Sequence, residues 1–233
     1  MFVIITGGSK GLGKALVELF LSKGFNVITC GRNAAALEQL SADMQALYPN
    51  PKLLTQAADL SKTSDTQQFA QFVLKNCDKI DILINNAGIF VTGNLQTEPD
   101  GLLEQMMQAN VYSAYHLTKN LLPQFITQQS GHIFNICSVA SSTILDNCTA
   151  YTISKHALLG FSHSLRHELK QHQVKVTTVV PGAIYTSSWD GVPVNPDRLM
   201  PTQDVAQAVA DCYQLSKRTV VEDIVLRPML GDL

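Results

Sequence analysis

The sequence predicts an α/β fold in which helices cover both faces of one parallel sheet. Short apolar runs alternate with longer amphipathic stretches along the whole chain, which is the order of elements in a βαβ fold. The short runs are mostly apolar rather than strictly alternating, and Phe2–Ile5 is apolar at every position, as strands are when both faces of a sheet are buried. The apolar fraction is 45% and the charged fraction only 15%, against about 25% in a typical soluble domain, so a large core is available.

Seven short runs rich in β-branched residues are the expected strands. They lie at Phe2–Ile5, Asn26–Cys30, Leu53–Ala57, Ile80–Ile84, His132–Cys137, Val174–Val180 and Val220–Leu226. The stretches between them have the length and period of helices, at Leu12–Lys23, Ala34–Leu47, Thr66–Asn76, Leu102–Ile126, Tyr151–His172 and Gln203–Leu215. The 102–126 stretch is long enough for two helices or a bend. Asn33 and Thr202 suit helix N-caps, and Gly24 suits the position that follows a helix.

The alternation of these elements predicts a Rossmann-like doubly wound parallel sheet of about seven strands. Residues 1–233 are expected to form a single domain, since the length suits one α/β unit and no linker or repeat interrupts it. In such sheets, ligands bind in the crevice at the carboxyl ends of the strands. The loop at 186–201 contains three prolines and the only tryptophan, and its length favours a role in substrate binding.

The composition argues against several classes of partner. Lys and Arg number 17 against 19 Asp and Glu, a balance that disfavours nucleic acid and a polybasic membrane surface. No run of apolar residues is long enough to predict a transmembrane helix, and the N-terminus lacks the pattern of a signal peptide. Five scattered cysteines without a C-x-x-C pair indicate reduced thiols in a cytoplasmic protein.

The first strand runs into a glycine turn, Thr6-Gly7-Gly8-Ser9-Lys10-Gly11-Leu12-Gly13, and then into a helix. Backbone N–H groups at a helix N-terminus attract anions, and glycine lets the backbone approach a pyrophosphate. From Gly8 onward the turn also fits G-x-x-x-x-G-K, the start of an NTPase phosphate loop. Ala15 stands where that loop needs a hydroxyl for Mg²⁺, which argues against an NTPase. An ordinary strand-to-helix turn is the remaining alternative.

Tyr151 and Lys155 form the second informative pattern. At a spacing of four residues they lie on one face of a helix, about 6 Å apart along its axis. A nearby ammonium group favours the phenolate form of tyrosine, so the pair is suited to proton transfer. Ser138 follows a buried strand, where its hydroxyl can bond a carbonyl or alcohol oxygen, although the same residue also suits a helix or turn cap.

Together these motifs resemble the short-chain dehydrogenase/reductase family over nearly the whole length of the chain. The resemblance rests on seven motifs in order: Thr6-Gly7-x-x-x-Gly11-x-Gly13, Asp59-Leu60, Asn85-Asn86-Ala87-Gly88, Asn110, Ser138, Tyr151-x-x-x-Lys155 and Pro181-Gly182-x-x-x-Thr186. It implies an NAD(P)-dependent enzyme that transfers a hydride between nicotinamide and a carbonyl or secondary alcohol.

The resemblance implies four catalytic residues. Tyr151 would be the general acid in reduction and the base in oxidation, and Ser138 would orient the substrate oxygen. Lys155 would bind the nicotinamide ribose and favour the phenolate. Asn110 would hold a water that links Lys155 to solvent.

The resemblance also implies a set of cofactor-binding residues, several of which suit turns or caps as well. Asp59 would contact the adenine amino group, and Ile184 would offer backbone atoms to the carboxamide. The full set is Thr6, Gly7, Ser9, Lys10, Gly11, Leu12, Gly13, Arg32, Asp59, Leu60, Asn86, Ala87, Gly88, Tyr151, Lys155, Pro181, Gly182, Ile184 and Thr186.

The residues after the second strand favour NADP(H) over NAD(H). An NAD site places an acidic residue there for the ribose 2′-hydroxyl, whereas an NADP site places an arginine. This strand ends in Thr29-Cys30-Gly31-Arg32-Asn33, without an acid. Arg32 can bind a 2′-phosphate through paired hydrogen bonds, and Lys10 adds a second charge. The alternative is that both are ordinary solvated surface charges.

The expected substrate is a small, mostly apolar carbonyl compound or alcohol. The residues expected to line its site are apolar or aromatic: Ile89, Phe90, Val139, Ala140, Leu145, Tyr185 and Trp189. Carbonyl reductase, 3-oxoacyl reductase and hydroxy-amino-acid dehydrogenase activities all fit the resemblance. No metal is expected, because His163 and His167 have a suitable spacing but no H-E-x-x-H motif is completed.

A homodimer through the helices at 110–125 and 151–170 is the expected assembly, and the low charged fraction favours such buried surface. The C-terminal segment lacks the Asp-Gly-Gly pattern that many tetrameric members of the family use, which puts the usual tetramer in doubt, and a monomer with solvent-facing helices is the alternative to the dimer. The competing function is a non-catalytic dinucleotide-binding sensor or scaffold. Such proteins tend to lose the tyrosine or the lysine, and both are present here.

Overall fold

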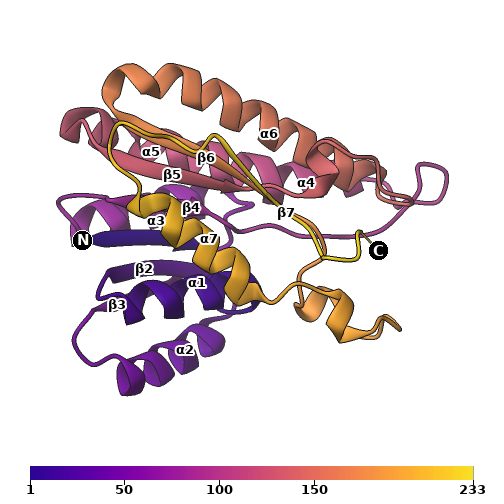
Figure 1. The fold of residues 1–233 in the computed structure, drawn as a ribbon, viewed down its shortest axis with the longest axis horizontal. Coiled ribbons are helices and arrows are strands. Elements are labelled where there is room, and N and C mark those ends of the chain that lie inside the picture. The colour runs from indigo at the N-terminus through magenta and orange to yellow at the C-terminus, as the bar shows by residue number, and fades with distance from the viewer. Residues whose placement is uncertain (233) are drawn as a thin grey trace.

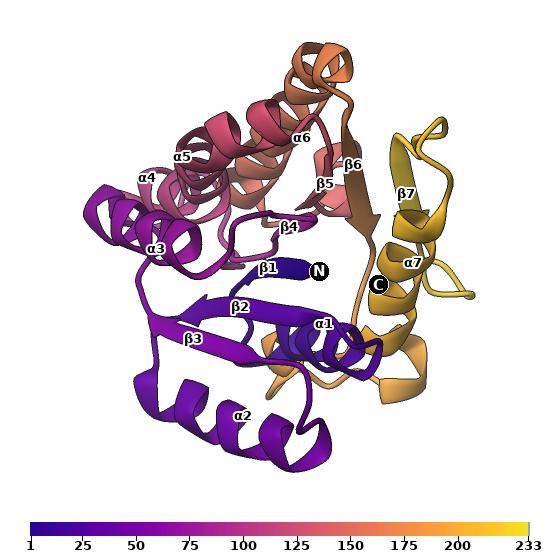
Figure 2. The same ribbon diagram turned by 90° about the vertical axis from the view of Figure 1, so that its left-hand side faces the viewer.

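The protein, described over residues 1–232 by a computed structural model, contains one seven-stranded parallel sheet. The strand order is β3-β2-β1-β4-β5-β6-β7, which confirms the doubly wound fold (Figures 1 and 2). The strands are β1 (Phe2–Thr6), β2 (Asn26–Gly31), β3 (Leu53–Ala57), β4 (Ile82–Asn85), β5 (Gly131–Ile136), β6 (Val174–Pro181) and β7 (Asp223–Leu226). All of them fall within or close to the runs expected from the sequence.

Helices cover both faces of the sheet because its central strands are buried on both sides. Figure 2 shows α1, α2 and α7 on one face and α3 to α6 on the other. Their bounds are α1 (Gly11–Ser22), α2 (Ala34–Leu47), α3 (Thr63–Asn76), α4 (Leu102–Met107), α5 (Ser113–Gln128), α6 (Thr149–Leu169) and α7 (Thr202–Gln214). Two large apolar clusters fill the layers between the sheet and these helices. Burial of this apolar area is the main driving force for the fold.

Local sequence sets several helix ends. The Asn33 side chain accepts a hydrogen bond from the Ala36 N–H at 3.1 Å, as expected of an N-cap. Gly24 follows α1 with a φ of 81°, which glycine adopts without strain. Thr202, also expected as a cap, is instead the first residue of α7, because the extended backbone of Pro201 takes the cap position.

The long 102–126 stretch is divided between two α-helices, one of the two outcomes that its length suggested. Between α4 and α5, residues Gln108–Tyr112 form one π-helical turn, η1, and Asn110 lies in it. Turns of this kind are rare and gather at functional sites. The Asn110 side chain reaches α6 from this turn, where its amide bonds the Ser154 hydroxyl.

The fold places the loops that carry the site at one edge. All seven strands run in the same direction, so their carboxyl ends lie together, on the right in Figure 1. The strand order reverses between β1 and β4, where the loops that follow them diverge and leave a crevice. Within residues 1–232, no helix is both long and apolar enough to cross a membrane.

Candidate active site

A cavity of about 890 Å³ lies along the carboxyl edge of the sheet. One end is formed by the glycine turn, Arg32 and the Asp59–Ser61 segment. The other end is formed by Ser138, Tyr151 and Lys155. Apart from Thr6 and Asn110, the cofactor-binding and catalytic residues expected from the sequence therefore line one continuous cavity.

The glycine turn is shaped for close approach of a ligand to the backbone. Gly7 has a φ of 70° and Gly11 a φ of 52°, conformations that favour glycine. A Cβ atom on Gly13 would overlap the carbonyl oxygen of Gly7. Gly8, which the sequence reasoning left out of the site, is required for another reason: a Cβ there would overlap the Thr29 hydroxyl of β2. These glycines let α1 begin directly against the sheet.

Thr6 and Asn86 join β1 to the loop after β4. The Thr6 hydroxyl accepts hydrogen bonds from the backbone N–H groups of Asn86 and Ala87, at 2.9 and 2.8 Å. In return, the Asn86 side chain donates to the Thr6 carbonyl oxygen at 2.8 Å. Thr6 is buried and does not line the cavity, so it positions the site from behind.

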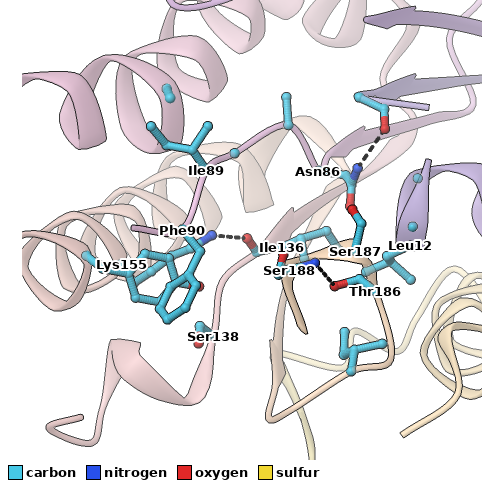
Figure 3. Close-up of a pocket in the computed structure, with 18 of the residues that line it drawn as sticks. Leu12, Asn86, Ile89, Phe90, Ile136, Ser138, Lys155, Thr186, Ser187 and Ser188 are labelled. Atoms are coloured by element: carbon cyan, nitrogen blue, oxygen red, sulfur yellow. Dashed lines mark hydrogen bonds between the residues drawn. The ribbon is translucent and has the colours of Figure 1, made fainter. Parts of the chain in front are cut away.

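Lys155 is held at the base of the cavity by the end of β5. Its ammonium donates to the Ile136 carbonyl oxygen at 3.0 Å, and only 6% of the residue is exposed (Figure 3). The Lys155 Nζ atom lies 5.7 Å from the centre of the Tyr151 ring. A buried cation with one carbonyl partner is well placed to stabilise negative charge in the cavity.

Ser138 faces the same end of the cavity and also caps a turn. Its hydroxyl accepts from the Ala140 N–H at 3.2 Å, and the Ser141 hydroxyl accepts from the Ser138 N–H at 3.3 Å. The two serines thus form a capping box around the short helix Val139–Ser141. The turn cap expected as the alternative for Ser138 is therefore present, and the hydroxyl lies at the cavity wall with its hydrogen still available for a ligand oxygen.

Asn110 lies behind the cavity rather than on its wall. It is 1% exposed, and its side-chain oxygen accepts from the Ile89 N–H at 2.8 Å. Its amide nitrogen donates to the Ile89 carbonyl at 3.1 Å and to the Ser154 hydroxyl at 2.9 Å. Both hydrogens of the side-chain amide are donated to protein acceptors, so only the side-chain oxygen, which accepts one hydrogen bond, has capacity left for a water.

The far end of the cavity carries the expected positive charge. Ser9, Lys10 and Arg32 line it, and both basic side chains belong to exposed residues. Asp59 also lines it, with its carboxylate accepting from the Ser61 N–H and hydroxyl at 3.2 and 2.8 Å. The nearby Cys30 is buried, and burial raises the pKa of its thiol to about 12, so it has no nucleophilic role at neutral pH.

The substrate end differs in part from the expected lining. Ile89, Phe90, Val139, Leu145 and Trp189 line the cavity as expected. Ala140 does not, because it is fully buried beneath the Ser138 turn. Tyr185 is 59% exposed and lines a separate shallow groove beside α1.

Several polar residues that the sequence reasoning missed also line the substrate end. They come from three loops, the η1 region and the C-terminal segment: Thr92, Gln105, Gln108, Asp146, Ser188 and Asp232. None of them belongs to a motif with regular spacing, so only the tertiary arrangement brings them to the cavity. Pro181, Gly182, Ile184 and Thr186, expected at the cofactor, line the same cavity.

Comparison with known proteins assigns the family. A family model described as short chain dehydrogenase matches residues 1–195. The chain belongs to the short-chain dehydrogenase/reductase family. Sepiapterin reductase of Chlorobaculum tepidum is 32% identical over 99% of this chain and 97% of its own length. A dehydrogenase/reductase SDR family member 7B of Bos taurus is 37% identical over 79% of this chain, which spans 58% of that protein.

Solved structures agree with this assignment. A metagenomic short-chain oxidoreductase in complex with NADP has a TM-score of 0.86 at 29% identity, covering 99% of this chain and 98% of that one. The alcohol dehydrogenase of the archaeon Thermococcus sibiricus has a TM-score of 0.92 at 21% identity, covering 100% and 98%, and shows the shared fold. The protein is thus an NAD(P)-dependent oxidoreductase of this family, as its motifs indicated.

Proposed function

We propose that the protein reduces a carbonyl compound with NADPH, or oxidises the corresponding alcohol with NADP. The observation that carries this proposal is that Ser138, Tyr151 and Lys155 line one cavity with the glycine turn. In this proposal residues 1–233 act as one catalytic unit, and the 186–201 loop, which contributes Trp189 to the cavity, covers the substrate.

The residues present fit a dinucleotide along the whole cavity. The glycine turn leaves no room for a Cβ at Gly13, Arg32 and Lys10 supply positive charge at one end, and Lys155 lies at the other. Lys155 would hold the nicotinamide ribose hydroxyls, and Ile184 the carboxamide. When bound, NADPH would supply the hydride for the reaction.

The protein's own part in reduction is to place the substrate oxygen and to deliver a proton. Ser138 Oγ–H donates a hydrogen bond to the carbonyl oxygen, and Tyr151 Oη transfers its proton to the same oxygen as the carbonyl carbon is reduced. The product is an alcohol, and the phenolate left on Tyr151 is stabilised by the Lys155 ammonium until a solvent proton replaces the one transferred. Oxidation runs through the same steps in reverse.

Substitution of Tyr151 tests this mechanism. Tyr151→Phe keeps the ring and its packing but removes the proton that is transferred. We expect turnover to fall by at least about a thousandfold while NADPH binding, measured by fluorescence titration, stays within about twofold. Undiminished turnover in this variant would refute the role of Tyr151. Tight NADPH binding by the wild-type protein without turnover of any carbonyl compound in a broad screen would instead support the non-catalytic sensor.

We further propose that NADP(H) is preferred over NAD(H). Arg32 and Lys10 line the far end of the cavity, and β2 is followed by no carboxylate that would repel a 2′-phosphate. Charge-assisted hydrogen bonds of this kind contribute about 1.5–3 kcal/mol, so NADPH should bind roughly ten to a hundred times more tightly than NADH. Titration of both cofactors measures this, and equal affinities would overturn it.

Two variants and a control test which residues cause the preference for NADP(H) over NAD(H). Arg32→Ser should weaken NADPH binding but not NADH binding, whereas Arg218→Ser, a change at an exposed arginine outside the cavity, should alter neither. Gly31→Asp should shift the preference toward NADH by placing a carboxylate near the ribose. A Cβ at Gly31 would lie 3.1 Å from the Ser9 hydroxyl oxygen, so the Ser9 side chain must move by a few tenths of an ångström.

The residues that line the substrate end favour a largely apolar carbonyl compound that carries some polar groups. Phe90, Leu145 and Trp189 provide an apolar wall, and Asp146 and Asp232 add carboxylates that can accept hydrogen bonds, although Asp232 is already paired with Arg227. A pterin ketone is therefore a specific second candidate, since full-length similarity to a sepiapterin reductase coincides with these acceptors for ring N–H groups. Parallel assays with sepiapterin and with small aryl ketones, following NADPH absorbance, separate the two substrate classes.

We also propose that the protein forms a homodimer through α5 and α6. Tyr112, Tyr115 and Ile153, which lie at or on these helices, are each more than 40% exposed and would supply apolar surface to such an interface. Light scattering should give about twice the chain mass, and Tyr115→Glu should return it to the mass of one chain. A monomeric wild-type protein would contradict this proposal, and a mass of four chains would show a tetramer.

A further inference from the structure

Ser154 is a buried residue of α6 whose hydroxyl makes two hydrogen bonds. The residue is fully buried, three positions after Tyr151 and directly before Lys155. Its hydroxyl donates to the Tyr151 carbonyl oxygen at 2.7 Å and accepts from the Asn110 side-chain amide at 2.9 Å. It therefore connects the backbone of the proton donor to the π-helical turn η1.

This connection continues into the loop after β4. The Asn110 side chain makes a pair of hydrogen bonds with the backbone of Ile89, at 2.8 and 3.1 Å. The next residue, Phe90, packs edge-to-face against the Tyr151 ring, with ring centres 4.8 Å apart. Figure 3 shows Ile89 and Phe90 on one stretch of chain at the part of the cavity bordered by Lys155 and Ser138.

The contacts form a closed ring. Beginning at the Tyr151 backbone, it passes through Ser154, Asn110, Ile89 and Phe90 and returns to the Tyr151 side chain. Tyr151 is thus bonded at its backbone carbonyl by Ser154 of the same helix, which Asn110 holds in turn, and is contacted at its ring by Phe90 of the loop after β4. The backbone bond fixes the helical turn that carries Tyr151, and the ring contact restricts rotation of its side chain away from the reactive geometry.

Helix stability does not account for a serine at this position. Serine is a weaker helix former than alanine, and a hydroxyl that bonds back to the preceding turn tends to weaken or bend a helix. Thr152, on the same helix, provides a comparison: its hydroxyl is buried but has no hydrogen-bond partner among the described residues. Unlike the Thr152 hydroxyl, the Ser154 hydroxyl connects the Tyr151 backbone to Asn110.

We propose that Ser154 is a positioning residue that, together with Phe90, orients the Tyr151 phenol toward Lys155 and the substrate oxygen. This inference rests on the proposed role of Tyr151 in proton transfer. It predicts that loss of the Ser154 hydroxyl impairs proton transfer without impairing cofactor binding, because the Ser154 side chain does not line the cavity.

The test compares Ser154→Ala with Thr152→Val, which removes the unpartnered hydroxyl from the same helix. For Ser154→Ala we expect kcat to fall about ten- to a hundredfold, with the NADPH dissociation constant unchanged. The pH profile of kcat for alcohol oxidation should move to more alkaline values, since a misplaced phenol loses part of its stabilisation by Lys155 as phenolate. Thr152→Val should leave both kcat and the pH profile at their wild-type values.

A second variant tests the contact between Phe90 and the Tyr151 ring. Phe90→Leu removes the ring contact and should move the pH profile of kcat in the same direction as Ser154→Ala. The losses of kcat in the double variant should be less than additive, because both substitutions act on Tyr151.

If Ser154→Ala keeps the wild-type kcat and pH profile while Tyr151→Phe is inactive, the positioning role is wrong and the proposed function stands. If Tyr151→Phe remains active, both fail. Equal losses in Ser154→Ala and Thr152→Val would show a general effect of substitutions in α6 and overturn the inference.

Discussion

At the scale of single residues, two glycines with different surroundings show which positions the site constrains. A Cβ on Gly13 would overlap the Gly7 carbonyl oxygen and approach the Asn86 side-chain amide to 2.8 Å. A Cβ on Gly160, on an exposed position of α6, would meet nothing within 4 Å. The same substitution should therefore have opposite effects at the two positions.

Gly13→Ala should destabilise the protein by about 1–3 kcal/mol, because the turn must move to admit the methyl group. It should also weaken NADPH binding by about tenfold or more, since 1.4 kcal/mol of lost contact energy is a factor of ten. Gly160→Ala should stabilise the protein by up to about 1 kcal/mol, because alanine lowers the entropy of the unfolded chain. Urea denaturation and cofactor titration measure both effects, and equal loss of stability in the two variants would contradict the explanation.

Residue-scale features were the most accessible from sequence. The glycine turn and the Tyr151–Lys155 pair depend on short spacings, and regular helix geometry converts those spacings into positions. The contacts of the Asn110 side chain could not be predicted from local spacing. Asn110 bonds Ile89, 21 residues away along the chain, and Ser154, 44 residues away. Ala140 was expected to line the substrate site because it lies two residues after Ser138. It is fully buried in the core instead, so closeness in sequence to a site residue does not place a side chain in the site.

At the scale of elements, Arg166 of α6 joins the two last strands. Its guanidinium donates to the Val176 carbonyl and the Thr178 hydroxyl of β6, at 3.0 and 3.1 Å. It also donates to the Glu222 carbonyl and to the Asp223 carboxylate of β7. Burial raises the pKa of Asp223, but hydrogen bonds from Thr178 and Arg166 outweigh burial and hold it below its usual value.

Arg166→Lys should loosen β7 in particular, because an ammonium group cannot reach both strands in the way the planar guanidinium does. We expect a loss of about 1–3 kcal/mol of stability and faster amide exchange in Asp223–Leu226 than in the central strands. Lys170→Met, a charge removal at an exposed position of the same helix region, should leave exchange in β7 unchanged. Uniform exchange across the sheet in Arg166→Lys would argue against a local role.

The element scale also shows why β7 was expected to begin too early. The apolar run starts at Val220, but the strand starts at Asp223. An edge strand is bounded by its hydrogen-bonded neighbour, and pairing with β6 begins at the match of Thr178 with Asp223. The sequence pattern shows which residues are apolar, but the start of a strand is set by the residue at which hydrogen bonding to the neighbouring strand begins.

At the scale of the whole molecule, the buried His132 links the stability of the sheet to pH. It lies in β5, stacks on Phe134 at 3.9 Å between ring centres, and shares a hydrogen bond with the Thr177 hydroxyl at 2.7 Å. Burial, with a smaller contribution from the charge of Lys175, lowers the pKa of His132 to about 3. The folded protein therefore holds His132 neutral.

The free energy of unfolding should consequently fall as the pH is lowered from about 6.5 toward 3. In this range the unfolded chain binds a proton at His132 that the folded chain does not, at a cost of up to about 1.4 kcal/mol per pH unit. Urea denaturation across this range should show a flatter pH dependence for His132→Phe than for the wild-type protein, most clearly between pH 5 and 6.5. His167→Gln, a change at an exposed histidine, should keep the wild-type slope.

The sequence by itself determined the strand and helix order, the parallel sheet, the glycine turn and the catalytic spacing, because these depend on local periodicity, turn chemistry and burial of apolar faces. The tertiary structure decided which side chains share the cavity. It brought Asp146 and Asp232 to the substrate end, removed Ala140 and Tyr185 from it, and closed the ring from Ser154 to Phe90 around Tyr151. Contacts between distant segments follow from how the helices pack on the sheet, and no short stretch of sequence encodes that packing.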